Sequence, residues 1–193
     1  KIAGLGILTE YIRDLTIDNF SAQLNKFSYY FLVLERMEKI RIREGLFERN
    51  VFSKNLLFLN ICQEAYLENI ILISNTNDIF LSNLISVGFF RNCLINQLYL
   101  FKNIIQQGTA LFFSSNENQT AEITLERLYF EMNKKTQGIN EDFLLSFSQL
   151  SNKSKILLNN SHFLSNFALK SRTKVCVSLK SNISLFLISN SFI

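Results

Sequence analysis

The predicted fold depends on one stretch of the chain, FFRNCLINQLYLFKNIIQQGTALFFSS, residues 89–115. Residues 89–93 can form a short strand, and residues 94–106 then show the apolar–polar rhythm of a helix of about three turns. Gly108 interrupts that rhythm, and residues 109–114 alternate in a way that is typical of a second strand. The stretch therefore predicts a strand, a helix and a strand, in that order.

The same alternation of element types is predicted on both sides of this stretch. Residues 69–74, NIILIS, form a short apolar run that favours a buried strand, and residues 156–158, ILL, indicate another. Residues 52–67 and 116–132 show helical spacing. Shorter helices are predicted around residues 80–87, from residue 140 onward, and at 162–169. The fold class predicted for the middle of the chain is therefore α/β (α+β), a small sheet with covering helices.

The first fifty residues are predicted to form a helical extension. Apolar residues recur there at steps of four and three, which places them on one face of a helix. They are Phe20, Leu24, Phe27, Phe31, Leu34 and Met37. The predicted organisation is a helical N-terminal extension over 1–50, an α/β domain over 51–170 and a basic, apolar C-terminal tail over 171–193. No internal repeat is predicted.

The composition indicates a globular protein encoded by an AT-rich genome. With 193 residues, of which 48% are hydrophobic, the chain can bury a sizeable core, and it is too apolar for a disordered protein. Proline and tryptophan are absent, while phenylalanine occurs 19 times. This bias towards AT-rich codons favours an organelle. Cys62, Cys93 and Cys176 are far apart and odd in number, which predicts buried free thiols in a reducing compartment.

Positive charge is concentrated near the C-terminus. Residues 151–193 contain six lysines and arginines and no aspartate or glutamate. Such a one-signed segment attracts polyanions, and this favours an interaction with the phosphate backbone of RNA. The alternative is a solvated tail that lysine keeps soluble.

No catalytic or metal-binding arrangement is predicted from the sequence. His162 is the only histidine and lies in the acid-free segment, so a catalytic triad around it is not expected. Glu141 and Asp142 are adjacent and would diverge on a helix, which excludes them as an acid/base pair. The apolar window 56–73 contains charged side chains, so no membrane span is predicted. The protein is therefore predicted to be neither an enzyme nor a cofactor- or metal-binding protein.

Several short motifs resemble a known ribosomal family. The order NIILISN, NDIFLSNLISVG, a basic–Asn–x–Leu step at residues 91–94, and GTALFFS at 108–114 is similar to the bacterial and organellar large-subunit ribosomal protein ten, the stalk-base protein. The strand ILLNN, residues 156–160, continues this order. The similarity covers roughly residues 52–170. The proline of the family's Gly-Pro-Thr-Ala-like step is missing, and the family's long C-terminal helix is not evident.

The resemblance implies a structural role in the large subunit of an organellar, mitochondrial ribosome. The chain would then bind ribosomal RNA at the stalk base, near the translation-factor site and beside neighbouring ribosomal proteins, with recruitment of stalk dimers left open. Arg91 could contact a phosphate and Asn92 a sugar or base edge. The predicted RNA-binding residues are Arg91, Asn92, Lys102, Lys170, Arg172 and Lys174.

A second hypothesis assigns the chain to a different class of protein. It would be a non-catalytic helical subunit of a mitochondrial membrane complex, such as ATP synthase or the respiratory chain, whose apolar faces meet partner subunits. Both hypotheses place the protein in the mitochondrion, in the matrix for the ribosomal one, and predict that the organelle encodes it.

Overall fold

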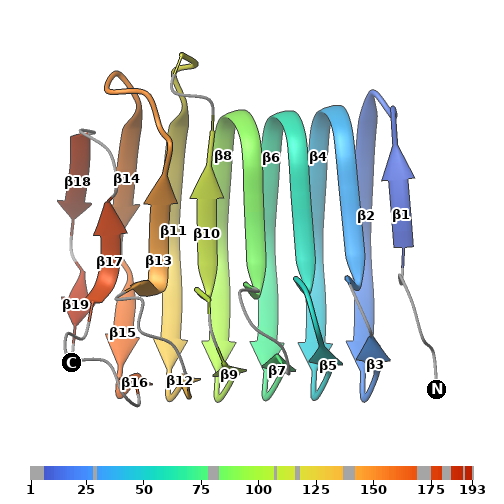
Figure 1. Ribbon diagram of the computed structural model, residues 1–193, viewed down its shortest axis with the longest axis vertical. Coiled ribbons are helices and arrows are strands. Elements are labelled where there is room, and N and C mark those ends of the chain that lie inside the picture. Colours follow the sequence, from blue (N-terminus) through green and yellow to red (C-terminus); the bar gives the residue numbers. More distant parts are fainter. Residues whose placement is uncertain are drawn as a thin grey trace.

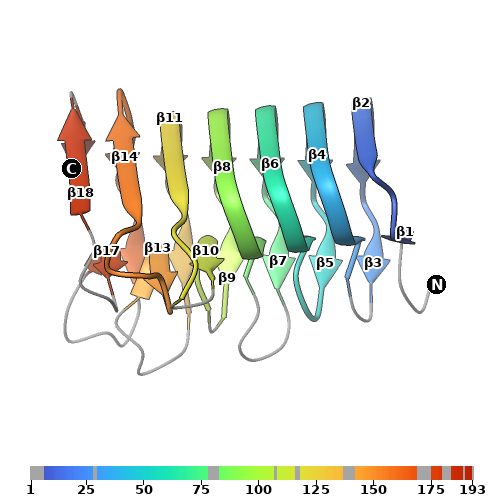
Figure 2. The same ribbon diagram turned by 90° about the horizontal axis from the view of Figure 1, so that it is seen from above.

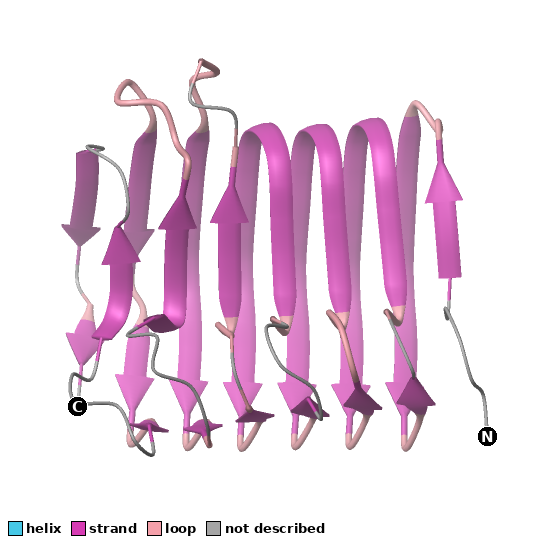
Figure 3. Ribbon diagram, viewed as in Figure 1, coloured by secondary structure: helices cyan, strands magenta, loops and turns pink. Residues whose placement is uncertain are grey.

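The chain folds as a parallel β-solenoid. The computed structural model describes residues 7–27, 30–77, 83–106, 108–115, 118–136, 142–168, 175–179, 184–188 and 190–192, and none of these residues is helical. Every strand pair formed by them is parallel, and the strands of the inner coils lie against their counterparts in the coils before and after them. Figure 1 shows the coils following one another from the N-terminal to the C-terminal end, and in Figure 3 the described residues are drawn as strands and connecting loops.

Nineteen strands are described. They are β1 (Ile7–Glu10), β2 (Asp14–Gln23), β3 (Lys26–Phe27), β4 (Leu32–Glu48), β5 (Val51–Phe52), β6 (Leu57–Ile73), β7 (Thr76–Asn77), β8 (Ile85–Phe101), β9 (Ile104–Ile105), β10 (Leu111–Ser114), β11 (Glu122–Glu131), β12 (Lys134–Lys135), β13 (Asp142–Ser148), β14 (Lys155–Asn159), β15 (His162–Leu164), β16 (Phe167–Ala168), β17 (Val175–Leu179), β18 (Ser184–Ile188) and β19 (Ser191–Phe192).

The strands form two sheets that share the solenoid axis. The large sheet contains 13 strands and includes the long strands β4, β6 and β8, each of 17 residues. The smaller sheet has six short strands in the order β16-β12-β9-β7-β5-β3. Later coils replace one long strand by shorter pieces: β10 and β11 both pair with β8. The view from above in Figure 2 shows that the long strands bend along their length.

Single residues in the left-handed conformation make the bends. They fall into three rows along the axis, which we call the first, second and third bends. The first bend comprises Tyr11, Arg36, Ile61, Phe89 and Gln149. The second comprises Asn19, Glu44, Asn69, Gln97, Arg127 and Asn160. The third comprises Leu24, Arg49, Ser74, Lys102, Met132 and Ser165. All have φ between 47° and 60°.

A row of asparagines follows the third bend. Its members are Asn25, Asn50, Asn75, Asn103, Asn133 and Asn166. At each step the backbone N–H and the side-chain Nδ2 of one asparagine donate to Oδ1 of the next, as from Asn103 to Asn133 at 3.0 Å each. The second amide hydrogen reaches back to a backbone carbonyl, as from Asn103 to Leu72 at 2.8 Å. Buried amides are costly unless they are hydrogen-bonded, and this ladder satisfies those at the corner of each coil.

Apolar side chains from the coils between β2 and β15 fill the interior. Leu34, Ile40 and Ile42 of β4 are completely buried, and the corresponding residues of β6 and β8 continue the same rows. Phenylalanines stack from coil to coil: the rings of Phe113 and Phe147 lie 5.1 Å apart and within 9° of parallel. In the described residues, the core therefore runs as one cluster from Ala22 in the first coil to Phe163 in β15.

The predicted α/β fold class, with covering helices and a helical N-terminal extension, is wrong. The described part of that extension consists of β1 to β4, which belong to the first two coils. Likewise, the helices predicted at 52–67, 94–106 and 116–132 are strand or loop wherever they are described. The reason is the bends. Each left-handed residue interrupts the alternation of inward and outward side chains, so that some buried residues of β4 are three positions apart rather than two, as at Leu34 and Met37 on either side of Arg36 and at Ile42 and Gly45 on either side of Glu44. Mixed steps resemble the spacing of an amphipathic helix.

The shorter helices predicted in the second half of the chain are also wrong where they are described. Residues 142–148 and 162–164 belong to β13 and β15. Several predicted strands are confirmed, because residues 70–73 lie in β6, 89–93 in β8, 111–114 in β10 and 156–158 in β14. In the described part of the chain, no helix has the length and apolar character needed to cross a membrane.

Candidate binding groove

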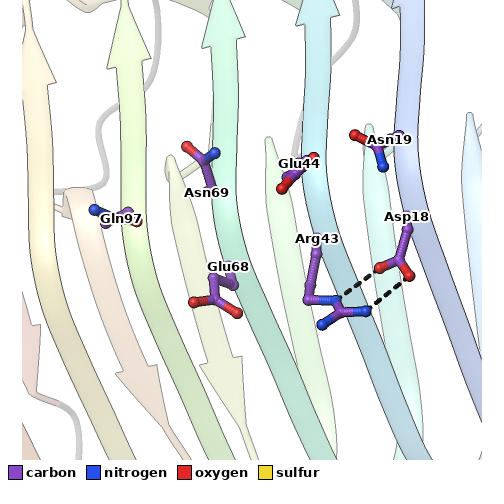
Figure 4. A pocket seen from close by; sticks show the side chains of 7 residues that line it. All are labelled: Asp18, Asn19, Arg43, Glu44, Glu68, Asn69 and Gln97. Atoms are coloured by element: carbon purple, nitrogen blue, oxygen red, sulfur yellow. Dashed lines mark hydrogen bonds and ion pairs between the residues drawn. The ribbon is translucent and has the colours of Figure 1, made fainter.

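An open groove runs along the second bend of the solenoid. Its volume is about 410 Å³, and it crosses β2, β4, β6 and β8. The side chains that line it are Asp18, Asn19, Arg43, Glu44, Glu68, Asn69 and Gln97 (Figure 4). Neighbouring parallel strands are about 4.8 Å apart, so four strands span roughly 14 Å. We call this feature the second-bend groove.

Register places the lining residues in two adjacent rows. Asp18 lies opposite Arg43, and Arg43 lies opposite Glu68, so these three side chains follow one another along the axis. The next residue on each strand is the left-handed residue of the second bend. On β4 the bend is followed by Gly45, where an added Cβ would clash with the ring of Phe20. The missing side chain of Gly45 therefore lets that ring pack beneath the groove.

One ion pair organises the N-terminal end of the groove. Arg43 donates to both carboxylate oxygens of Asp18, with Nε–Oδ1 and Nη2–Oδ2 distances of 2.7 and 2.8 Å. The hydrogen bond from Arg43 holds the pKa of Asp18 below its ordinary value of 3.8, although desolvation opposes this. The same bond raises the pKa of Arg43, and the charges of Glu68 and Glu44 add to the effect.

The groove carries an excess of negative charge. The lining residues include three carboxylates, on Asp18, Glu44 and Glu68, and one guanidinium, on Arg43. Two negative charges in the groove are therefore not balanced by a cation of the groove. The amides of Asn19, Asn69 and Gln97 add both hydrogen-bond donors and acceptors. A hydroxyl-bearing ligand can satisfy this mixture, whereas a polyanion would meet electrostatic repulsion.

A row of aromatic rings lies next to the groove. Tyr99, Tyr129 and His162 each follow a second-bend residue by two positions. Tyr99 and Tyr129 stack with centroids 4.6 Å apart, and Tyr129 and His162 stack at 5.3 Å. Their faces are turned towards one another, so this row holds the coils in register, while Tyr99 remains 40% exposed at its N-terminal end.

Among the predicted RNA-binding residues, the structure describes Arg91, Asn92 and Lys102, and these three do not lie together. Arg91 is exposed on β8, and Asn92 is half-buried in register between Glu64 and Glu122, two carboxylates that would repel a phosphate. Lys102 lies at the third bend, beyond the groove, with its ammonium 4.7 Å from the ring centroid of Phe101. Lys170, Arg172 and Lys174 lie outside the described residues.

A smaller hollow of about 330 Å³ lies at the first bend. It is lined by Ile61, Cys62, Gln63, Phe89 and Gln119. Ile61 and Phe89 are 46% and 50% exposed, and both have positive φ. Cys62 and Cys93 are free and buried, as predicted. Burial raises the pKa of Cys62 to about 12, so its thiol is a poor nucleophile at neutral pH. No group of three or more metal-ligating side chains was found in the described part of the chain.

The residues of the groove were missed at the sequence level. Asn19, Glu44 and Asn69 recur at intervals of 25 residues, but their chemistry varies from coil to coil, so only the interval carries a signal. That signal could have been read from the ladder, where Asn25, Asn50 and Asn75 recur at the same interval without any change of residue.

Comparison with protein-family models, curated proteins and solved structures finds no match to this chain.

Proposed function

We propose that this chain is a non-catalytic binding protein, which holds an extended, hydroxyl-rich polymer such as a polysaccharide lengthwise in the second-bend groove. The observation that carries the proposal is the groove itself. It crosses four successive strands and is lined by polar side chains that recur in register from coil to coil. Extended binding surfaces of this kind are typical of repeat proteins, whose sites repeat along one axis.

The balance of donors and acceptors favours a polyhydroxylated ligand. Hydroxyls can donate to Glu44 and Glu68, which form no hydrogen bond or ion pair with another described residue, and can accept from the amides of Asn69 and Gln97. A chain of ammonium groups could only donate, and the formal net charge of +4 opposes its approach. Phosphate groups could only accept and would face two uncompensated carboxylates.

We propose binding rather than cleavage because the pKa of Asp18 in the groove is lowered. Glycoside hydrolysis by paired carboxylates requires one of them to keep its proton, which needs a raised pKa. In the groove, the hydrogen bond from Arg43 lowers the pKa of Asp18. A carboxylate held in an ion pair is suited to positioning a ligand rather than to donating a proton.

Calorimetry with linear oligosaccharides of increasing length tests this proposal. We expect affinity to rise from disaccharides to longer chains and to level off when the groove is filled, because each added unit meets a further coil. Glu68→Gln and Asn69→Ala should each weaken binding by roughly 5- to 30-fold, which corresponds to about 1–2 kcal/mol for a lost hydrogen bond to a ligand. Glu122→Gln, on the flat face of β11 away from the groove, serves as the matched control.

Ribosomal RNA is the competing ligand to include in the same titration. The predicted ribosomal role remains a hypothesis, although the strand–helix order on which the resemblance depended is absent from the described residues. Binding of RNA that weakens steeply with salt, together with no binding of any oligosaccharide, would support the ribosomal hypothesis and contradict the glycan one. The second hypothesis required a helical subunit of a membrane complex. None of the described residues is helical, so they give this hypothesis no support.

A further inference from the structure

Two large apolar side chains are exposed at the first bend in spite of an unfavourable backbone conformation. Ile61 has φ of 55° and Phe89 has φ of 49°, and the two residues are 46% and 50% exposed. The left-handed region is unfavourable for β-branched and bulky residues, and backbone strain of this kind clusters at sites that hold ligands. Neither local conformational preference nor burial accounts for these two residues, which points to a function of their side chains.

Both side chains line the hollow of about 330 Å³ at the first bend. Cys62 contributes a buried thiol to it, and the amides of Gln63 and Gln119 complete the lining. A concavity with an apolar surface and a few polar groups is typical of a small-molecule site. Benzene fits a cavity of about 150 Å³, so this hollow has room for two fused rings.

Two arginines stand beside the hollow. Strand register places Arg36 beside Ile61 and Arg91 beside Gln63. Both arginines are exposed, and neither forms an ion pair with another described residue. The guanidinium of Arg36 lies 4.9 Å from the ring centroid of Tyr11, so a guanidinium already stacks on an aromatic ring at this bend.

The rim of the hollow carries an excess of positive charge. Three carboxylates of β4 and β6 lie in the same region, and each is engaged with another side chain at 2.9 to 3.1 Å. The pairs are Glu35 with Asn60, Glu38 with Arg13 and Glu64 with Lys39. Among these three carboxylates one lacks a cationic partner, whereas both guanidiniums beside the hollow lack an anionic one. An anionic group on a ligand would therefore be attracted to the rim.

We propose that the first-bend hollow binds a small aromatic carboxylate, with the ring against Ile61 and Phe89 and the carboxylate at Arg91. The amides of Gln63 and Gln119 can donate to the same carboxylate. An aromatic ring gains an additional contact with the ring of Phe89, and a guanidinium both pairs with a carboxylate and stacks on an aromatic face. The site is separate from the second-bend groove, and this inference is independent of the glycan proposal.

A small molecule is specified because the exposed apolar surface at the hollow is too limited for a protein partner. A stable protein interface buries about 800 Å² on each side. Here the exposed apolar surface comes from Ile61 and Phe89, and amides and arginines border it. An aliphatic acid has the same charge as an aromatic one but lacks the ring that can stack on Phe89 and on a guanidinium.

Calorimetry of the full chain with 2-naphthoate tests the proposal. We expect a dissociation constant on the order of 0.1 mM, as is reasonable for a small ligand in an open hollow. Two analogues should each bind about five-fold more weakly: neutral 2-naphthamide, which lacks the charge, and decahydro-2-naphthoate, which lacks the aromatic ring. In spectra of the isoleucine methyl groups, 2-naphthoate should shift the signals of Ile61 and leave those of Ile104, which is exposed on β9, unchanged.

Variants of the protein complete the test. Arg91→Gln should weaken the binding of 2-naphthoate about five-fold and leave that of 2-naphthamide unchanged, whereas Arg49→Gln, at the exposed third bend, should change neither. Ile61→Asn should weaken both compounds, because the apolar wall of the hollow is lost. If Ile61→Asn disturbs the coil, Arg91→Gln and the three compounds on the unaltered chain still decide.

Four results would each overturn the proposal. They are absence of 2-naphthoate binding, binding of either analogue as tightly as 2-naphthoate, methyl shifts elsewhere without a shift at Ile61, and unchanged 2-naphthoate binding in Arg91→Gln.

Discussion

Asn50 and Asn75 lie in neighbouring coils and bind each other side chain to side chain, with Nδ2 of Asn50 donating to Oδ1 of Asn75 at 2.9 Å. Both are completely buried. Oδ1 of Asn75 also accepts the backbone N–H of Asn50, and Nδ2 of Asn75 donates to the carbonyl of Phe47 at 2.8 Å. One side chain therefore satisfies three buried polar groups of the preceding coil, and the corner of the solenoid depends on it.

Removal of this side chain should destabilise the protein strongly. Asn75→Ala leaves the N–H of Asn50 and the carbonyl of Phe47 buried without these partners. An unsatisfied buried group costs about 1–3 kcal/mol, so we expect a loss of roughly 2–4 kcal/mol, measured by urea unfolding. Asn92→Ala, on the half-exposed face of β8, should change stability by less than about 0.5 kcal/mol. Equal effects of the two substitutions would contradict the structural role of the ladder.

The 25-residue interval between the first ladder asparagines was present in the sequence but was obscured by composition. In a chain rich in asparagine, the recurrence of asparagine at positions 25, 50 and 75 is easily attributed to codon bias. Loops of different length then stretch the interval, because Asn103, Asn133 and Asn166 follow at spacings of 28, 30 and 33 residues. The repeat is regular in space because hydrogen bonds fix it, while insertions between corners make it irregular in sequence.

Short apolar runs were predicted correctly as strands, whereas long patterned segments were not. Residues 70–73 are apolar and partly β-branched, and no bend interrupts them, so their local signal agrees with β6. Across Arg36 the alternation changes phase, and Leu34 and Met37 both face the core. The groove could not be predicted for the same reason: its side chains come together only when the bends of four coils are superimposed.

The ion pair at the groove should make stability depend on pH in the acid range. The pKa of Asp18 is lower in the folded chain than its ordinary value of 3.8, because Arg43 stabilises the carboxylate. Its contribution is therefore fully present above about pH 4 and is lost as the pH falls through the lower folded pKa. We expect the free energy of unfolding of Asp18→Asn to fall less steeply than that of the wild type on acidification.

Urea unfolding at a series of pH values between neutral and strongly acidic measures this difference. The carboxylate of Asp18 is exposed, so the effect should be small and should weaken in high salt. Asp14→Asn, on the same strand but without an ion pair in the described structure, is the control. An identical acid slope for wild type and Asp18→Asn would show that the pair with Arg43 contributes nothing to folding.

The two buried thiols should be inert in the folded protein. Burial raises the pKa of Cys62 to about 12 and also raises the pKa of Cys93, so little thiolate forms at pH 8. In a Cys176→Ser background, alkylation by iodoacetamide should be at least about 100-fold slower in the native state than in urea, because the thiolate is the reactive form and both groups are shielded. Rapid native labelling of Cys93 would mean that the core opens locally around β8.

A substitution at the first bend should stabilise the protein even though it removes an apolar side chain. Ile61 has φ of 55°, a conformation that is unfavourable for a β-branched residue by about 1–2 kcal/mol, and its side chain is 46% exposed. Glycine adopts this conformation without strain but also lowers stability by increasing the freedom of the unfolded chain, whereas asparagine tolerates it with less entropic cost. Ile61→Asn should therefore gain up to about 1 kcal/mol in urea unfolding.

Ile71→Asn is the control. Ile71 is a partly buried residue of the same strand that is not at a bend, so this substitution should lower stability. A loss of stability at both positions would contradict this prediction. It would mean that the packing of the Ile61 side chain beside Phe89, at the hollow of about 330 Å³, contributes more than the backbone strain costs.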